Sequence, residues 1–90
     1  MSSKDLRRKR LRAFIMVTVK PGTSEEIVSS RRIKGVIIAD SVLGRFDAIV
    51  VIEADNLEDL KKITYEMIEQ HPNVIHTETI ISIFHPSVSS

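Results

Sequence analysis

The chain has 90 residues, of which 42% are hydrophobic and 28% are charged, and its formal net charge is +1. A chain of this length forms one domain around a single core. It contains no cysteine, which excludes disulfide frameworks, thiolate nucleophiles and cysteine-ligated metal sites. No apolar run approaches about 18 residues and no secretory signal pattern is present, so we expect a cytoplasmic protein without a membrane partner.

The charge is unevenly distributed along the chain. Residues 1–12 contain six basic side chains and one acidic one, whereas residues 13–90 contain seven basic and eleven acidic ones. We therefore divide the chain into a basic N-terminal extension (1–12), a folded domain (13–85) and a C-terminal tail (86–90). The extension is either a flexible, solvated segment or one that contacts nucleic acid weakly and non-specifically, because dense Lys and Arg neutralise phosphates with little sequence preference.

Hydrophobic periodicity and turn signals predict four strands and two helices in the folded domain. Thr23 and Glu26 have the spacing of a capping box at the start of the first helix, and Asp55 and Asn56 can cap the second. The expected elements in chain order are strand 13–19, helix 24–32, strands 36–42 and 46–53, a helix from 57 to 70, and strand 74–84.

This order, βαββαβ, is the ferredoxin-like arrangement of an α+β protein, with a four-stranded antiparallel sheet and two helices on one face. The strands are apolar on both sides. Residues 13, 15, 17 and 19 alternate with Phe14 and Met16, and the strand from Phe46 to Glu53 has the same character. Two helices cover only one face of a sheet, so the other face must meet a second copy or a partner. The pattern therefore predicts self-association.

The sequence contains few groups that could perform catalysis. The three histidines, His71, His76 and His85, are scattered and form no zinc signature, and no phosphate-binding glycine motif is present. We therefore expect no catalytic residues, no metal and no cofactor.

Asp47, Thr77 and Thr79 are the polar residues within strands that could serve a ligand. Asp47 lies in the apolar run 46–52, where it either ties down the turn at 44–47 or receives the ammonium group of a ligand. Thr77 and Thr79 share one face of a strand. They are either ordinary strand formers or hydroxyls that hydrogen-bond a small polar ligand at an interface.

Three motifs in this order resemble the ligand-binding domain of the Lrp/AsnC family, the RAM (regulation of amino acid metabolism) domain. The first strand ends at Lys20-Pro21-Gly22. The segment 42–47, Val-Leu-Gly-Arg-Phe-Asp, resembles the Gly-x-aromatic-Asp motif of the family. The run from Val74 through Thr77 and Thr79 to Ile81 is similar to its C-terminal strand signature. The resemblance covers nearly the whole folded domain.

The resemblance implies a dimeric αβ barrel, in which the free sheet faces of two protomers pack together and the dimers assemble further into tetramers or octamers. It also implies that a free amino acid binds at interfaces between dimers. Carried over by motif, the ligand-binding residues would be Gly44, Arg45, Phe46, Asp47, Thr77 and Thr79.

The function that the resemblance implies is a non-catalytic amino-acid-binding and oligomerisation module linked to transcriptional regulation. Only a dozen residues precede the first strand, so the chain resembles a stand-alone form without the helix-turn-helix, and a full-length Lrp/AsnC-type regulator is an expected partner. Two alternatives stay open. One is a small dimeric αβ-barrel enzyme of the monooxygenase type, whose pocket would lie between the sheet and helices of one protomer. The other is a purely structural oligomer.

Overall fold

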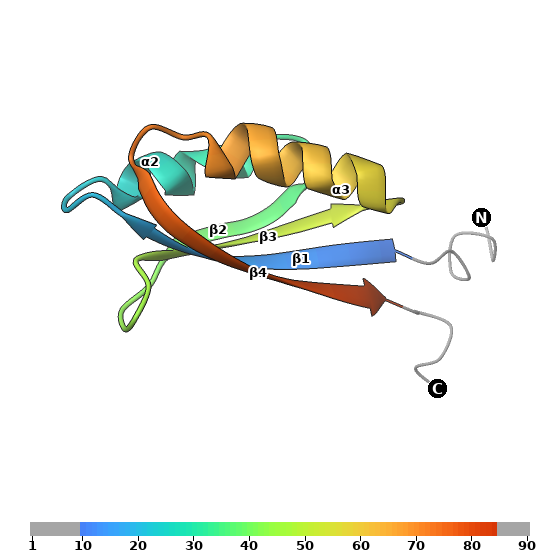
Figure 1. Ribbon diagram of the computed structural model, residues 1–90, viewed down its shortest axis with the longest axis horizontal. Helices are drawn as coiled ribbons and strands as arrows, with labels where there is room; N and C mark the ends of the chain where they lie inside the picture. The colour runs from blue at the N-terminus through green and yellow to red at the C-terminus, as the bar shows by residue number, and fades with distance from the viewer. Residues whose placement is uncertain (1–9, 85–90) are drawn as a thin grey trace.

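The computed structural model describes residues 10–84, and the predicted order of elements is confirmed (Figure 1). Residues 1–9 of the predicted extension and the tail 86–90 lie outside the described residues. The elements are β1 (Arg10–Val19), α2 (Ser24–Val28), the 3₁₀ helix η1 (Ser29–Arg32), β2 (Val36–Ser41), β3 (Ala48–Ala54), α3 (Leu57–Ile63), the π-helix η2 (Thr64–Glu69) and β4 (Val74–Phe84).

The four strands form one antiparallel sheet in the order β2-β3-β1-β4, so β1 pairs with β3 on one side and with β4 on the other. The helices α2 and α3 lie together on one face of this sheet (Figure 1). The predicted ferredoxin-like arrangement of an α+β protein is therefore confirmed.

The core fills the layer between the sheet and the helices. Alternate residues of the two inner strands point into it, because side chains on a strand alternate between its two faces. They pack against side chains from the helices and leave almost no accessible surface. The largest fully buried side chains are Ile15, Val17, Ile27, Val50, Ile52, Leu60 and Ile68.

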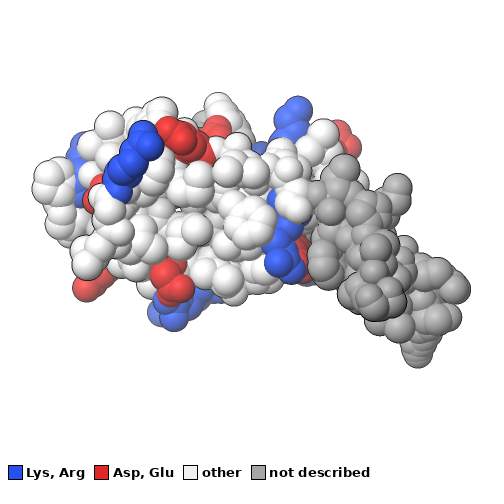
Figure 2. Space-filling model, turned by 90° about the horizontal axis from the view of Figure 1, so that it is seen from below, with Lys and Arg blue, Asp and Glu red and all other residues white. Residues whose placement is uncertain are grey.

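The opposite face of the sheet, which we call the open face, has no helix over it (Figure 1). Phe14 pairs there with Val51 on β3 and with Ile80 on β4, and Met16 pairs with Ile49. Val51 is buried by its neighbours, but Ile80 remains 59% exposed. Figure 2, which views the molecule from this side, shows few charged side chains across the middle of the face.

Strand β1 begins three residues earlier than the sequence pattern indicated. Leu11 pairs with Ala54 and Ile83, and Arg12 pairs with Glu53 across the sheet. The Arg12 guanidinium donates to the Glu53 carboxylate and forms an ion pair with it. Arg12 is therefore compatible with a position in the strand, because a carboxylate on the neighbouring strand balances its charge.

The strands at the β2–β3 connection are shorter than expected. β2 ends at Ser41 and β3 begins at Ala48, so Phe46 and Asp47 belong to the connection and not to a strand. At Asp47, backbone bonds to Val42 within the connection and to Val17 on β1 take the place of strand pairing.

The two predicted helix caps have different outcomes. The capping box at Thr23 is wrong, because the Thr23 hydroxyl donates to the Lys20 carbonyl at 2.7 Å and makes no cap bond. Glu26 turns away from the cap and accepts a bond from the Asn73 side chain. The cap at Asn56 is confirmed, since its side-chain oxygen accepts from the Asp59 N–H at 2.8 Å.

Gly35 lets the chain pass close to α3 before β2. It has a φ of +99°, and a Cβ added there would lie 2.9 Å from Ile63 Cδ1. We predict that Gly35→Ala lowers the free energy of unfolding by about 2 kcal/mol, because an alanine is strained at this positive φ and the end of the Ile63 side chain must also move aside. Chemical denaturation measures this change.

Gly22→Ala is the matched control for Gly35→Ala. Gly22 also has a positive φ, +80°, but nothing lies within 4 Å of an added Cβ. Its loss should be about 1 kcal/mol, from the backbone alone. Equal losses for the two variants would contradict the proposed role of the Ile63 contact.

Candidate functional site

The connection between β2 and β3, residues 42–47, holds four of the predicted ligand-binding residues. It projects on the side of the sheet away from the helices (Figure 1). The Val42 N–H donates to the Asp47 carbonyl at 3.0 Å, which closes the connection. Gly44, with a φ of +136°, has open space around it, and Arg45 lies over the Phe46 ring at 5.8 Å from its centroid.

Asp47 joins this connection to the end of β1. Its backbone N–H donates to the Val17 carbonyl at 2.8 Å, and its carboxylate accepts from the Val19 N–H at 2.9 Å. These bonds support the interpretation that Asp47 holds the connection 42–47 in place. Its carboxylate fixes the connection to β1, however, and not to another residue of the turn. One carboxylate oxygen, Oδ1, is not involved in the Val19 bond.

Thr77 and Thr79 lie on β4, on the far side of β1 from Asp47. Thr77 pairs with Val17 and Thr79 pairs with Ile15, whose side chains point into the core, so both threonines lie on the helix side of the sheet. Thr77 is half-buried and Thr79 is exposed, because the helices do not extend fully over β4. The two motifs are two strand spacings apart, about 10 Å, so one protomer brings them to the same sheet but not into one cavity.

A groove runs between β4 and the helical segment that follows β3, and we call it the edge groove. Its volume is about 380 Å³. Thr79 and Ile81 line it from β4, and Thr79 is the one predicted ligand-binding residue in its lining. The remaining lining residues come from α3 and η2, and they are Leu60, Lys61, Thr64, Tyr65 and Glu69.

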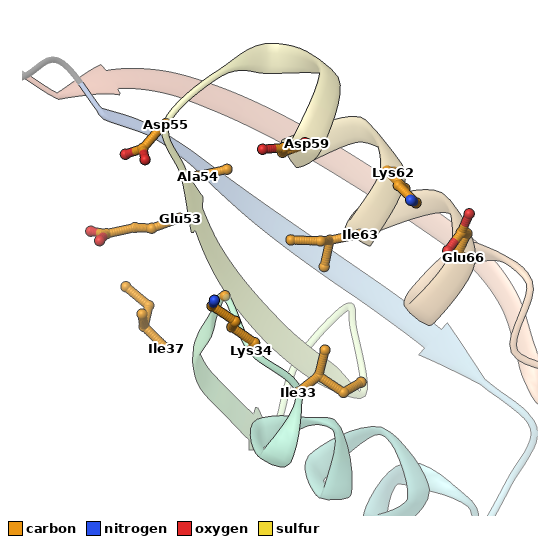
Figure 3. A pocket seen from close by; sticks show the side chains of 11 residues that line it. Ile33, Lys34, Ile37, Glu53, Ala54, Asp55, Asp59, Lys62, Ile63 and Glu66 are labelled. Atoms are coloured by element: carbon orange, nitrogen blue, oxygen red, sulfur yellow. The ribbon is translucent and has the colours of Figure 1, made fainter.

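A second groove, which we call the charged groove, lies at the other side of α3, between it and the chain that leads into β2 (Figure 3). Its volume is about 660 Å³. None of the predicted ligand-binding residues lines it. Its charged lining residues are Lys34, Glu53, Asp55, Asp59, Lys62 and Glu66.

Two of the histidines lie near carboxylates. His71 Nε2 lies 3.6 Å from Glu26 Oε1, and His76 Nε2 lies 3.5 Å from Glu78 Oε2. His85 lies outside the described residues. Within residues 10–84, no three metal-ligating side chains cluster, and no helix has both the length and the hydropathy needed to cross a bilayer.

Sequence reasoning missed most of the edge groove. Its helical residues include the pairs Leu60/Thr64, Lys61/Tyr65 and Tyr65/Glu69, each four positions apart, which places them along one side of a helix. That spacing was visible in the sequence. The sequence did not show which side of the helix faces β4. Leu60 illustrates this, because it lies in the core and also lines the edge groove.

The sequence matches the family model described as the Lrp/AsnC ligand binding domain over residues 12–87. No match was found among the curated proteins.

Solved structures share the fold. A hypothetical protein, PHS023, from Pyrococcus horikoshii is 30% identical with a TM-score of 0.78, over 89% of this chain and 98% of that one. The protein FFRP-DM1 is 32% identical with a TM-score of 0.75, over 80% and 97% of the two chains. The transcriptional regulator NMB0573 from Neisseria meningitidis, solved as an L-Met complex, is 15% identical with a TM-score of 0.70, over 91% and 55%. At this last identity the likeness concerns the fold alone.

We predict that Asp47→Ala lowers the free energy of unfolding by about 1–3 kcal/mol, because it leaves the partly buried Val19 N–H without its acceptor. Asp40→Ala is the matched control, since Asp40 is exposed and its ion pair with Arg31 lies at the surface. Its effect should stay within about 0.5 kcal/mol. Similar losses for both variants, measured by urea denaturation, would show that the Asp47 tether is not a stabilising contact.

Proposed function

This chain belongs to the Lrp/AsnC ligand-binding domain family, whose members are effector-binding regulatory modules, and we propose that its effector is a free amino acid. We also propose that the chain acts as an oligomer, with the effector bound where copies meet. The observation that carries the proposal is the apolar open face, because a sheet with one uncovered apolar face needs a second layer.

A second copy is the layer that best fits the open face. The apolar residues of the face are Phe14, Met16, Ile49, Val51 and Ile80, and the pairing places two carboxylates beside them, Glu78 opposite Met16 and Asp40 opposite Ile49. Two such faces packed together form the dimeric αβ barrel expected from the resemblance. The connection 42–47 projects to the same side as the open face, so in this dimer it would reach toward the partner copy.

The site we propose combines the two motifs from different copies. Gly44, Arg45, Phe46 and Asp47 lie on one side of β1, and Thr77 and Thr79 lie on the other. Asp47 Oδ1 offers an acceptor for an ammonium group, and the threonine hydroxyls offer donors for a carboxylate. Dimers that associate into tetramers or octamers would bring the two half-sites together.

The regulatory role that we propose follows from the same assembly. A ligand that binds between copies stabilises the assembled state relative to the separated one, because it binds only where both half-sites are present. A longer regulator with the same domain would present the same open face, so it is the protein partner that we propose for co-assembly.

The enzyme alternative requires a catalytic pocket between sheet and helices. That layer is filled by core side chains, and the two grooves lie at its edges. Neither lining includes a histidine. These observations favour effector binding over catalysis as the function of this chain.

We predict that the protein sediments as a dimer or larger species and that Ile80→Asp shifts it to the monomer, because the new carboxylate would be buried without a partner in the dimer. Sedimentation velocity at micromolar concentration measures this. Leu57→Asp is the control, since Leu57 is 46% exposed on α3, away from the open face. A wild-type monomer, or an Ile80→Asp variant that sediments like the wild type, would contradict the dimer.

We predict that one amino acid or a few of the twenty raise the melting temperature by several degrees at about 100 times the dissociation constant. Asp47→Asn should remove this response with little change in fold, because its side-chain oxygen can still accept from the Val19 N–H. Asp40→Asn, which changes the same charge at an exposed position, should keep it. The absence of a shift with every amino acid would contradict the proposed effector.

A further inference from the structure

The charged groove offers an apolar surface bordered by charged side chains. Its apolar lining residues are Ile33, Ile37, Ala54 and Ile63. Ile37 is 47% exposed, and the charged residues that line the groove are exposed or half-buried. An exposed concave apolar surface with a polar border is typical of a surface that another segment or molecule covers.

One end of the charged groove lies beside the start of β1. Leu11 pairs with Ala54, a groove residue, and one step further along the same antiparallel pairing the backbone of Arg10 comes opposite that of Asp55. Figure 3 shows Ala54 and Asp55 at this end of the groove and Glu66 at the other end. The chain that precedes Arg10 therefore joins the described fold next to the groove.

The chain that precedes Arg10 carries a charge opposite to that of the groove. Four carboxylates and two ammonium groups line the groove. Residues 1–9 contain four basic side chains and one acidic one, which are Lys4, Arg7, Arg8, Lys9 and Asp5. Arg12, the last basic residue of the N-terminal extension, already pairs with a carboxylate of the groove lining, Glu53. Complementary charges of this kind favour association and fix its register.

The length of the segment fits the length of the groove. Nine residues span at most about 30 Å when extended. Asp59 and Glu66 lie seven helical positions apart, which is about 10 Å, so residues 1–9 can follow the groove from end to end. Because they are covalently joined to Arg10, their effective concentration at the groove is high, about millimolar for a short linker. A separate basic peptide would have to compete with them.

We propose that residues 1–9 bind in the charged groove of their own chain. Their basic side chains face the carboxylates of the groove, and Leu6, the large apolar residue among residues 2–9, covers Ile37. Ala54 and Ile63 pack against the core, which places the groove on the helix side of the sheet, whereas the proposed dimer uses the open face. The docked segment and the dimer are therefore compatible, and docking withholds the basic residues from nucleic-acid phosphates.

The test is limited trypsin digestion of the full chain at low ionic strength. Trypsin cleaves after Lys and Arg, and residues 4–9 offer four such sites. A docked segment is cleaved only when it opens, so the rate of cleavage at these sites follows the population of the open form. Glu66→Lys should raise this rate about fivefold, equivalent to about 1 kcal/mol, because it replaces an attraction by a repulsion. About 1 M sodium chloride should remove the difference.

Glu69→Lys is the matched control for Glu66→Lys. It makes the same change of charge three residues further along, but Glu69 lines the edge groove on the other side of the helix, so the cleavage rate should stay unchanged.

A second pair of variants tests the apolar contact. Ile37→Ser should also speed cleavage of residues 4–9, because it removes the surface proposed for Leu6. Ile38→Ser is its control, since Ile38 is the next residue of β2 and is 44% exposed, but does not line the groove.

Three outcomes would overturn the inference. Equal cleavage rates in the wild type, Glu66→Lys and Glu69→Lys would show that the segment is solvated. Protection that is lost in the Ile80→Asp variant would place the segment on another copy of the chain. Protection that appears only after a DNA duplex is added would assign the segment to nucleic acid. None of these readouts involves an amino acid, so they leave the proposed effector binding in place.

Discussion

The double pairing of β1 is the constraint on which the rest of the structure depends. β1 is bonded along both edges, to β3 and to β4, and its alternate side chains form the centre of the core. Val17 illustrates this position. Its side chain is buried under the helices, its carbonyl accepts from the Asp47 N–H, and it pairs with Thr77 on the other side. A single strand thus sets the spacing between the two motifs that the family resemblance assigned to one site.

That spacing keeps the two motifs apart within one copy of the chain. The sheet holds Asp47 and Thr77 on opposite sides of β1, and side-chain movement cannot close a gap of about 10 Å between two such short side chains. The helices fill one face and leave the other apolar. The same sheet therefore leaves the motif residues apart in one copy and presents the apolar surface on which the proposed dimer rests.

The sequence was sufficient to predict the element order, the ferredoxin-like fold and the cap at Asn56, because each depends on local periodicity or on a local side-chain bond. It failed at Thr23, where the Glu26 N–H donates to the Thr23 carbonyl and the Thr23 hydroxyl donates to the Lys20 carbonyl. It also could not reveal that Asp47 binds the Val19 N–H, since those residues are distant in the chain. The edge groove was equally invisible, because it depends on which side of the helix faces β4 and on a π-helical turn at Thr64–Glu69.

The pairing of Arg10 with Phe84 has a consequence for any longer protein that contains this domain. Because partners in an antiparallel pair lie about 5 Å apart, segments joined before β1 and after β4 leave the domain side by side. Asp47 is bonded to Val19 at the other end of β1, nine residue steps and about 30 Å away. Mechanical communication between the connection at Asp47 and a domain fused at either terminus would therefore have to travel the length of the strand.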